Sequence, residues 1–307
     1  MNRHYLYGVA AYTDVLLFDL PSCNVLSVSD SGSPVYVKRS EENRTGAHLG
    51  QTYAVPGTHG RELALHTDRP VSNGRELGQS WCMDVDGVVS FWWVSGGVDI
   101  EYQLHREGTH TLLAFWLVHI FLPLYLTLER GYDFIHAAAV ELHRKSVLFV
   151  APSEGGKSTM VAHFLDQGHS MLADDKVAVF ESDGRYRAAP SHPHNRPYRQ
   201  LEVFGDPVKH FASETHPIQA IYLLERADPD AVIEISEITG FRKFEQLVPS
   251  YLYGFRFLKE HRMRWLAMLS NQLALYQVNR PWNLARMSEV YDAICAHSHS
   301  LEKSEDD

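Results

Sequence analysis

The 307-residue sequence has few cysteines and no excess of basic charge, and each shortage excludes a class of protein. Its three cysteines, Cys23, Cys82 and Cys295, are far apart and form no CxxC pair, which argues against a zinc site and against a disulfide framework. The formal net charge is −10, whereas general nucleic-acid binders draw most of their affinity from a basic face. We therefore expect no nucleic-acid partner.

The sequence also lacks an obvious targeting segment. The N-terminal residues MNRHYLYGVAAYTDV contain no apolar core of the kind found in secretion signals. Together with the scarcity of cysteine, this favours a reducing, cytoplasmic location. No internal repeat or low-complexity tract is present, and 45% apolar with 21% charged residues is ordinary for a folded chain.

One long apolar run could instead indicate a membrane protein. Residues 111–128, TLLAFWLVHIFLPLYLTL, reach the lower length limit for crossing a bilayer. The run contains His119 and Pro123, and Arg106 and Arg130 flank it on both sides without defining an orientation. A fully buried helix explains the same letters. We expect the buried helix and no membrane span.

The first third of the chain has the pattern of a β-rich module. Short apolar runs are separated by Gly, Asp, Ser and Asn clusters, which is typical of strands and turns. The runs are VLLFDL, VYVK, VVSFWWV and VDIEYQL. The stretch from about 40 to 80 is polar and weakly patterned, so we expect it to be loop-rich.

From residue 131 onward, strand-like and helix-like patterns alternate, which predicts an α/β domain. The expected strands are AAAVELH, SVLFV, MLADDKVAVF, IQAIYLL and LALYQV, with a helix over about 157–167 and an amphipathic closing helix at MSEVYDAICAH. The predicted organisation is a β-rich module over 1–110, a buried connecting helix over 111–130, an α/β domain over 131–298 and an acidic tail over 299–307.

The stretch VLFVAPSEGGKSTMVAHFL, residues 147–165, resembles a phosphate-binding loop between a strand and a helix. Such a loop binds phosphate because consecutive backbone N–H groups point inward at a helix N-terminus. In the motif a lysine reaches the terminal phosphates and the next hydroxyl binds magnesium. The candidate nucleotide-binding residues are Ser153, Glu154, Gly155, Gly156, Lys157, Ser158 and Thr159.

Two positions depart from the usual loop. Ala151 replaces the first glycine, but it precedes Pro152, which favours extended geometry where alanine is unstrained. Glu154 places an acid in an anion site, and a positive φ there would cost about 1 kcal/mol. Two other interpretations stay open at this point: an ordinary Gly-Gly-Lys turn, and a decayed loop that no longer binds nucleotide.

Two adjacent aspartates follow the loop. Asp174 and Asp175 lie in SMLADDKVAVF, seventeen residues after Lys157, with apolar residues on both sides. Adjacent strand residues point to opposite faces, so one carboxylate could meet magnesium while the other meets an acceptor hydroxyl. Phosphoryl transfer needs both functions. The alternative is a solvated acidic pair in a turn.

Histidines give weaker signals. His136 lies twenty-one residues before Lys157, in DFIHAAAVEL, and by spacing alone a structural role is the more frequent one. His192 and His194 lie in the proline-rich stretch SHPHNRP and form no clear metal-ligand spacing.

Taken in order, the histidine, the loop and the aspartate pair resemble the C-terminal catalytic domain of HPr kinase/phosphorylase. Relatives of that family include the kinases found beside lasso-peptide biosynthesis genes. The likeness covers about residues 131–295 and is specific in the first fifty of them. It implies an α/β phosphate-loop kinase domain related to HPr kinase and phosphoenolpyruvate carboxykinase, which uses ATP and Mg²⁺ to phosphorylate a serine hydroxyl.

The resemblance also implies roles for individual residues. Lys157 would bind the phosphates and Ser158 the magnesium. Asp174 would be the general base, Asp175 a magnesium ligand or structural partner, and His136 a residue that tunes the aspartates.

Further along, QLEVFGD resembles the glutamate-bearing signature of the family, which makes Glu202 a second metal ligand. Phe204 stands where HPr kinase has an arginine, which puts reverse phosphorylase activity in doubt. The N-terminal module differs from that of HPr kinase, so the phosphocarrier protein is not the expected substrate.

The sequence thus predicts a kinase whose acceptor is a peptide or small protein, with a lasso-type precursor peptide as one candidate. A sugar or polyol kinase and a catalytically silent nucleotide- or peptide-binding module are the alternatives. Family members are often homo-oligomers. The aromatic pairs Trp92–Trp93 and Tyr251–Tyr253 would line a peptide groove or, more commonly for large aromatic residues, form core.

Overall fold

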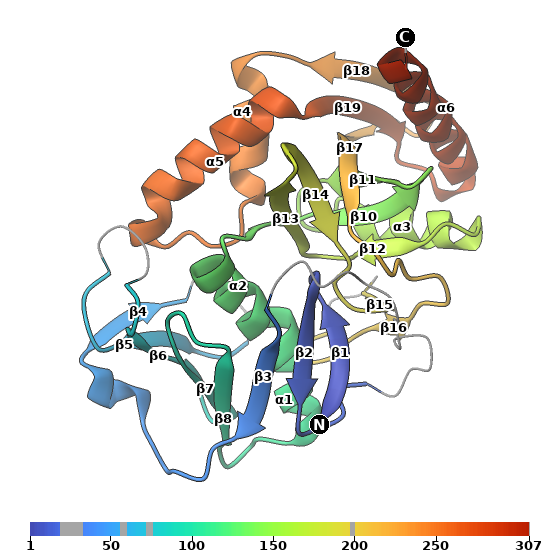
Figure 1. Ribbon diagram of the computed structural model, residues 1–307. Coiled ribbons are helices and arrows are strands. Elements are labelled where there is room, and N and C mark those ends of the chain that lie inside the picture. The colour runs from blue at the N-terminus through green and yellow to red at the C-terminus, as the bar shows by residue number, and fades with distance from the viewer. Residues whose placement is uncertain (19–32, 56–59, 72–75, 197–199, 307) are drawn as a thin grey trace. The chain divides into compact units, whose positions relative to one another are not determined.

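The computed structural model of the chain divides into two compact units (Figure 1). The structure describes residues 1–18, 33–55, 60–71, 76–196 and 200–306. We call Met1–Asp133, Arg199–Phe204 and Tyr253–His261 the N-terminal unit. We call Phe134–Tyr198, Gly205–Leu252 and Arg262–Asp307 the C-terminal unit. The fold is mixed α/β, and its N-terminal part is rich in strands, as the sequence predicts.

The N-terminal unit contains one eight-stranded sheet. Its strands are β1 (Asn2–Leu6), β2 (Val9–Thr13), β3 (Val35–Arg39), β4 (Gln51–Ala54), β5 (Leu63–Thr67), β6 (Ser80–Val85), β7 (Val89–Val94) and β8 (Asp99–Leu104). Their order is β1-β2-β3-β8-β7-β6-β5-β4, and β3 is parallel to both its neighbours.

Two expectations for this sheet need correction. The region from 40 to 80 is not simply loop, because it holds β4, β5 and a 3-10 helix at Gly46–Leu49. Edge strand β4 has only half-buried and exposed residues, so its sequence shows no apolar alternation. In VLLFDL, residues 15–18 form no strand and the rest lies outside the described residues.

The apolar run forms a continuous helix that belongs to the N-terminal unit. It consists of α1 (His110–Trp116), a π-helical turn (Leu117–Phe121) and α2 (Leu122–Arg130). The Thr109 hydroxyl caps its start by accepting from the Leu112 N–H, and Gly131 ends it with a φ of 68°. By length and composition alone the helix could cross a membrane, but 89% of its most apolar window is buried. This burial favours the core-helix interpretation.

A buried carboxylate on this helix organises the adjacent sheet. Glu129, 3% exposed, accepts hydrogen bonds from Trp93 Nε1 at 3.0 Å, from the Ser95 hydroxyl at 2.7 Å and from Gly96 N at 3.1 Å. Removing this acceptor would take the partner from two buried donors, the Trp93 N–H and the Ser95 hydroxyl, and each of them carries a desolvation cost.

We therefore expect Glu129→Ala to lower the free energy of unfolding by about 3 kcal/mol. Urea denaturation followed by tryptophan fluorescence measures this. The control Glu42→Ala, at an exposed carboxylate 3.7 Å from Arg44, should change stability by less than about 1 kcal/mol. Equal effects of the two substitutions would contradict the role given to Glu129.

The C-terminal unit is built on a nine-stranded mixed sheet. Its strands are β9 (Asp133–Ile135), β10 (Ala138–Leu142), β11 (Lys145–Val150), β12 (Met171–Ala173), β13 (Val177–Ser182), β14 (Arg185–Ala189), β17 (His216–Ala227), β18 (Glu234–Ile238) and β19 (Ala274–Pro281). The main path runs β12-β10-β11-β17-β14-β13-β9, and β19 pairs with β17 and β18. Strands β11, β17 and β19 are mutually parallel, so their carboxyl ends lie at one edge.

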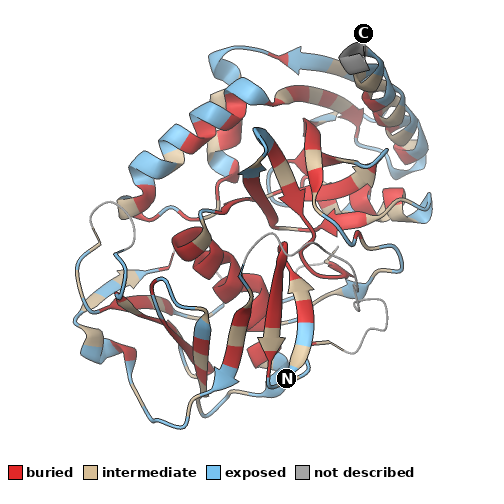
Figure 2. Ribbon diagram, viewed as in Figure 1, coloured by how far each residue is buried: buried red, intermediate tan, exposed pale blue. Residues whose placement is uncertain are grey.

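Two helices, α3 (Lys157–Asp166) and α6 (Met287–Asp306), pack in the same apolar cluster as β10, β11, β17 and β19. Figure 2 shows the central strands of this sheet as mostly buried, which explains why β11 is a continuous apolar run. The unit also contains α4 (Phe241–Leu247), most of α5 (Lys259–Gln272) and a small sheet of β15 (His194–Asn195) and β16 (Asp206–Pro207). Residues 299–306, expected as a tail, continue α6.

Candidate active site

The loop between β11 and α3 lies where the three parallel strands end. Crevices at the carboxyl ends of parallel strands are the usual ligand sites of α/β sheets. Strand β11 ends at Val150, and α3 begins at Lys157 after Gly156, whose φ is 83°. This φ favours glycine, and a Cβ at Gly156 would come within 2.4 Å of Arg280 Nη2, so a larger residue would also displace that guanidinium.

The two unusual loop positions have clear local explanations. Ala151 is buried and has no positive φ, and a Cβ at Gly155 would lie 2.6 Å from the Ala151 Cβ, so the two positions pack closely. Glu154 is exposed and adopts a φ of 61°, the strained conformation considered from the sequence. The acid therefore faces solvent.

The lysine of the loop is almost completely buried. Lys157 is 6% exposed, and its Nζ donates to the carbonyl oxygens of Ala151 at 2.7 Å and Pro152 at 3.2 Å. The ammonium group thus lies against the loop that precedes it in sequence, with its charge solvated by backbone oxygens.

The first aspartate meets the helix that follows the loop. Asp174 lies just after β12, is 2% exposed, and accepts from the Ser158 hydroxyl at 2.9 Å and from Arg196 N at 2.8 Å. Burial raises the pKa of Asp174, and the neighbouring Asp175 charge adds to this, while the Arg196 N–H and the Ser158 hydroxyl act in the opposite direction. The carboxylate is therefore more basic than an exposed one.

The second aspartate meets the histidine. Asp175 has a φ of 78°, and His136 Nδ1 lies 3.0 Å from its carbonyl oxygen and 3.2 Å from Oδ1. The two carboxylates thus have different partners, Ser158 for Asp174 and His136 for Asp175. The loop, both aspartates and the histidine all belong to the C-terminal unit.

Glu202 belongs to the N-terminal unit. Its carboxylate accepts from Arg61 Nε at 2.5 Å and from Trp116 Nε1 at 3.0 Å, and the bond to Arg61 lowers the pKa of Glu202. Its expected role as a second metal ligand stays a prediction.

Sequence reasoning missed two arginines beside the loop. Arg226 of β17 donates to the Glu154 carbonyl oxygen at 2.6 Å, and Arg280 of β19 donates to the Gly155 carbonyl oxygen at 2.5 Å. They are register partners in the β17–β19 ladder. The only sequence signal for them was their place at the end of two apolar runs.

It also missed the segment after His194. The Asn195 amide donates to the Ser158 carbonyl oxygen at 3.4 Å, and the next residue, Arg196, supplies the backbone N–H for Asp174. His192 is buried, and burial lowers its pKa to about 3, so it is neutral at physiological pH. The proline-rich stretch thus supports the site.

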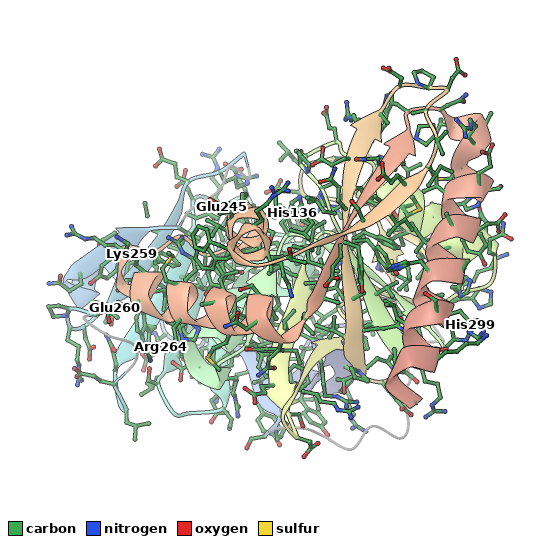
Figure 3. All side chains as sticks on the ribbon, turned by 90° about the horizontal axis from the view of Figure 1, so that it is seen from above. His136, Glu245, Lys259, Glu260, Arg264 and His299 are labelled. Atoms are coloured by element: carbon green, nitrogen blue, oxygen red, sulfur yellow. The ribbon has the colours of Figure 1, made fainter. Side chains whose placement is uncertain are left out.

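Two groups of side chains have the chemistry of metal ligands. The Ser158 hydroxyl and Asp174 carboxylate form an all-oxygen set of the kind Mg²⁺ prefers. Separately, His143, His299 and Glu302 have ligand atoms within 4.8 Å of one another, and in the part of the chain that the structure describes they are the one cluster of three or more His, Cys, Asp or Glu ligands. His299 and Glu302 lie on α6, away from His136 (Figure 3).

Comparisons with known proteins add little. No family model and no curated protein matches the chain. Among solved structures, the HPr(Ser) kinase/phosphatase from Coxiella burnetii is similar over 56% of this chain and 93% of its own, with 11% identity and a TM-score of 0.32. That similarity is too small to assign an activity.

Proposed function

We propose that the chain is an ATP-dependent kinase that transfers the γ-phosphoryl group to a hydroxyl, that of a serine in a peptide or small protein. The observation that carries the proposal is the 2.9 Å hydrogen bond between Ser158 and the buried Asp174, beside the loop that ends at Lys157. Phosphate cradle, metal-binding hydroxyl and carboxylate are the parts that phosphoryl transfer needs.

In the proposed complex, backbone N–H groups over Ser153–Thr159 face the phosphates at the N-terminus of α3. Lys157 exchanges the carbonyl oxygens of Ala151 and Pro152 for phosphate oxygens. This exchange keeps the ammonium group solvated throughout, so it costs little desolvation.

Ser158 and Asp175 would supply oxygen ligands that fit Mg²⁺. The metal would neutralise charge on the phosphates. His136 holds Asp175 through Nδ1 and so fixes the geometry of the turn that carries both aspartates.

Asp174 is the proposed general base. As the acceptor oxygen bonds to the γ-phosphorus, its proton passes to the Asp174 carboxylate, and the bond from phosphorus to the bridging oxygen of ADP breaks with its electron pair on ADP. The raised pKa of Asp174 suits this role, because a base works best when its pKa approaches the working pH.

The N-terminal unit is proposed to bind the acceptor. A cavity of about 330 Å³ is lined there by Trp81, Trp92, Trp93, Arg44 and Glu101 among others. Arg44 lies 4.8 Å from the Trp92 ring centroid and pairs with Glu101. Aromatic walls with a few polar groups are typical of ligand sites of this size.

Burial alone does not separate the two aromatic pairs, because Trp92 and Trp93 are 8% and 4% exposed, but these tryptophans line the cavity. Tyr251 and Tyr253 are 8% and 4% exposed, and the Tyr253 hydroxyl donates to the Ile120 carbonyl oxygen at 3.4 Å. Their burial favours the core interpretation.

Incubation with γ-labelled ATP, Mg²⁺ and a size-fractionated host-cell extract tests the proposal, with Lys157→Ala as the control. Label in peptides or proteins that the variant fails to produce is the expected result. Label among metabolites would move the acceptor to a sugar or polyol. Absence of label with nucleotide still bound would identify a silent binding module.

Glu154→Gly should stabilise the protein by up to about 1 kcal/mol, because glycine adopts a positive φ without steric cost. Thermal unfolding measures the gain. Asp183→Gly is the matched control: Asp183 has a φ of 54° in the turn between β13 and β14. Both variants should gain stability, and Glu154→Gly alone should also tighten ATP binding, since it removes an anion near the phosphates. A loss of stability in Glu154→Gly would contradict the strain assigned to that residue.

A further inference from the structure

Arg280 is a buried cation that has no acidic partner among the residues described by the structure. It is 3% exposed, donates to the Gly155 carbonyl oxygen and contacts the Trp282 ring, whose centroid lies 4.8 Å from Cζ. Nε of Arg280 is buried and has no hydrogen-bond partner within the described residues. In the same part of the chain, no carboxylate pairs with this guanidinium.

The neighbouring charge makes this burial more costly. Arg226, its register partner on β17, lies 3.9 Å from the Trp282 ring centroid, so two guanidinium groups share one indole. Burial lowers the pKa of Arg280, and the like charge of Arg226 lowers it further. A buried, unpaired charge is strongly unfavourable unless a partner of opposite sign binds there.

The positions of the two arginines indicate which partner. Both lie at the carboxyl ends of parallel strands, and both donate to consecutive carbonyl oxygens of the loop, those of Glu154 and Gly155. In a trans peptide the N–H points opposite to the C=O, so the Gly156 N–H points away from Arg280, whereas the Gly155 N–H donates to the Pro152 carbonyl oxygen at 2.9 Å. The two cations and the N-terminus of α3 favour the same anion.

We infer that Arg280, assisted by Arg226, is a phosphate ligand of this site, which binds the oxygen atoms of a polyphosphate chain held by the loop. The inference rests on the proposed function for the identity of the anion. A guanidinium group can bind phosphate through two parallel hydrogen bonds. Nε of Arg280, which has no partner within the described residues, would donate one of them. Arg226 acts as a positioning residue, because it holds the loop through Glu154.

Binding of tripolyphosphate to the full chain, measured by calorimetry, tests the inference without any transfer step. Arg280→Gln should weaken binding about ten- to hundredfold, since charge-assisted hydrogen bonds are lost. The affinity of Arg280→Lys for tripolyphosphate should lie between those of the wild type and Arg280→Gln, because lysine keeps the charge but lacks the guanidinium fork. Arg187→Gln is the matched control: Arg187 also donates to a loop carbonyl oxygen, that of Thr215, but at the other end of β17. Its affinity should equal that of the wild type.

A structural arginine would behave differently. If Arg280→Gln lowers the melting temperature in the absence of anion and leaves tripolyphosphate affinity unchanged, Arg280 only supports the fold and the inference is wrong. The wild type could bind tripolyphosphate, and Arg280→Gln could weaken that binding, while no assay detects phosphoryl transfer. That result would support the inference about Arg280 and contradict the proposed kinase activity. Failure of the wild type to bind tripolyphosphate or ATP would overturn both.

Discussion

Asp174→Asn is expected to retain ATP binding and to lose phosphoryl transfer by roughly a thousandfold, the usual contribution of a positioned general base. The asparagine oxygen still accepts from the Ser158 hydroxyl, whereas the Arg196 N–H loses its acceptor, and the side chain no longer takes a proton. Single-turnover transfer from γ-labelled ATP, together with calorimetric ATP binding, separates the two effects. Asp166→Asn, at an exposed carboxylate on α3, is the control and should leave both unchanged.

The same variant has a pH signature. Because burial raises the folded-state pKa of Asp174 above its unfolded value, the protonated form is favoured in the folded protein. The contribution of Asp174 to the free energy of unfolding is then greatest below the unfolded pKa and falls as pH rises through the folded one. The stability of the wild type relative to Asp174→Asn should therefore decline over that interval. Transfer by the wild type should rise over the same interval, as the carboxylate ionises.

Transfer in Asp174→Asn equal to that of the wild type would remove Asp174 from the mechanism. The base would then have to be sought at Asp175, whose carboxylate lies 3.2 Å from His136 Nδ1.

Lys157→Ala is expected to weaken ATP binding about tenfold or more and to reduce transfer by several further orders of magnitude, because the lysine supports charge that develops on the phosphates. Binding and single-turnover transfer are measured as above. Lys303→Ala, at an exposed lysine on α6, is the matched control with no expected effect on either.

The fold of Lys157→Ala should survive. Water can replace the lost donor at the Pro152 carbonyl oxygen, because Pro152 is exposed, whereas loss of the buried bond to the Ala151 carbonyl oxygen should cost about 1–3 kcal/mol. Circular dichroism and the melting temperature verify this. If transfer and ATP affinity were unchanged in a folded Lys157→Ala, the loop would not be the phosphate site.

The parts of the fold that the sequence predicts are those with strong local patterns. Strand β11 and helix α3 combine a buried apolar run with Gly155 and Gly156, and both elements are found where they were expected. Strand β4 was missed because it lies at a sheet edge and buries little. The long helix was anticipated, but its place in the N-terminal unit depends on tertiary packing that no local pattern contains.

The contacts of the candidate site likewise include some that the sequence could predict and some that it could not. Ser158 and Asp174 are sixteen residues apart, and their contact could be anticipated from the strand–loop–helix order. The arginines are 72 and 125 residues from their carbonyl partners in the loop, Glu154 for Arg226 and Gly155 for Arg280. Only the order β11-β17-β19 brings these residues together, and hydrophobic periodicity does not determine the order of strands in a sheet.

A crystal structure of the chain with Mg²⁺ and a non-hydrolysable ATP analogue tests the central claim most directly. The account predicts phosphates on the N–H groups of Ser153–Thr159, Lys157 Nζ on phosphate oxygens instead of the Ala151 carbonyl oxygen, the metal on the Ser158 hydroxyl, and Asp174 facing the γ-phosphate. A nucleotide bound elsewhere, with Lys157 still on the Ala151 carbonyl oxygen, would contradict it.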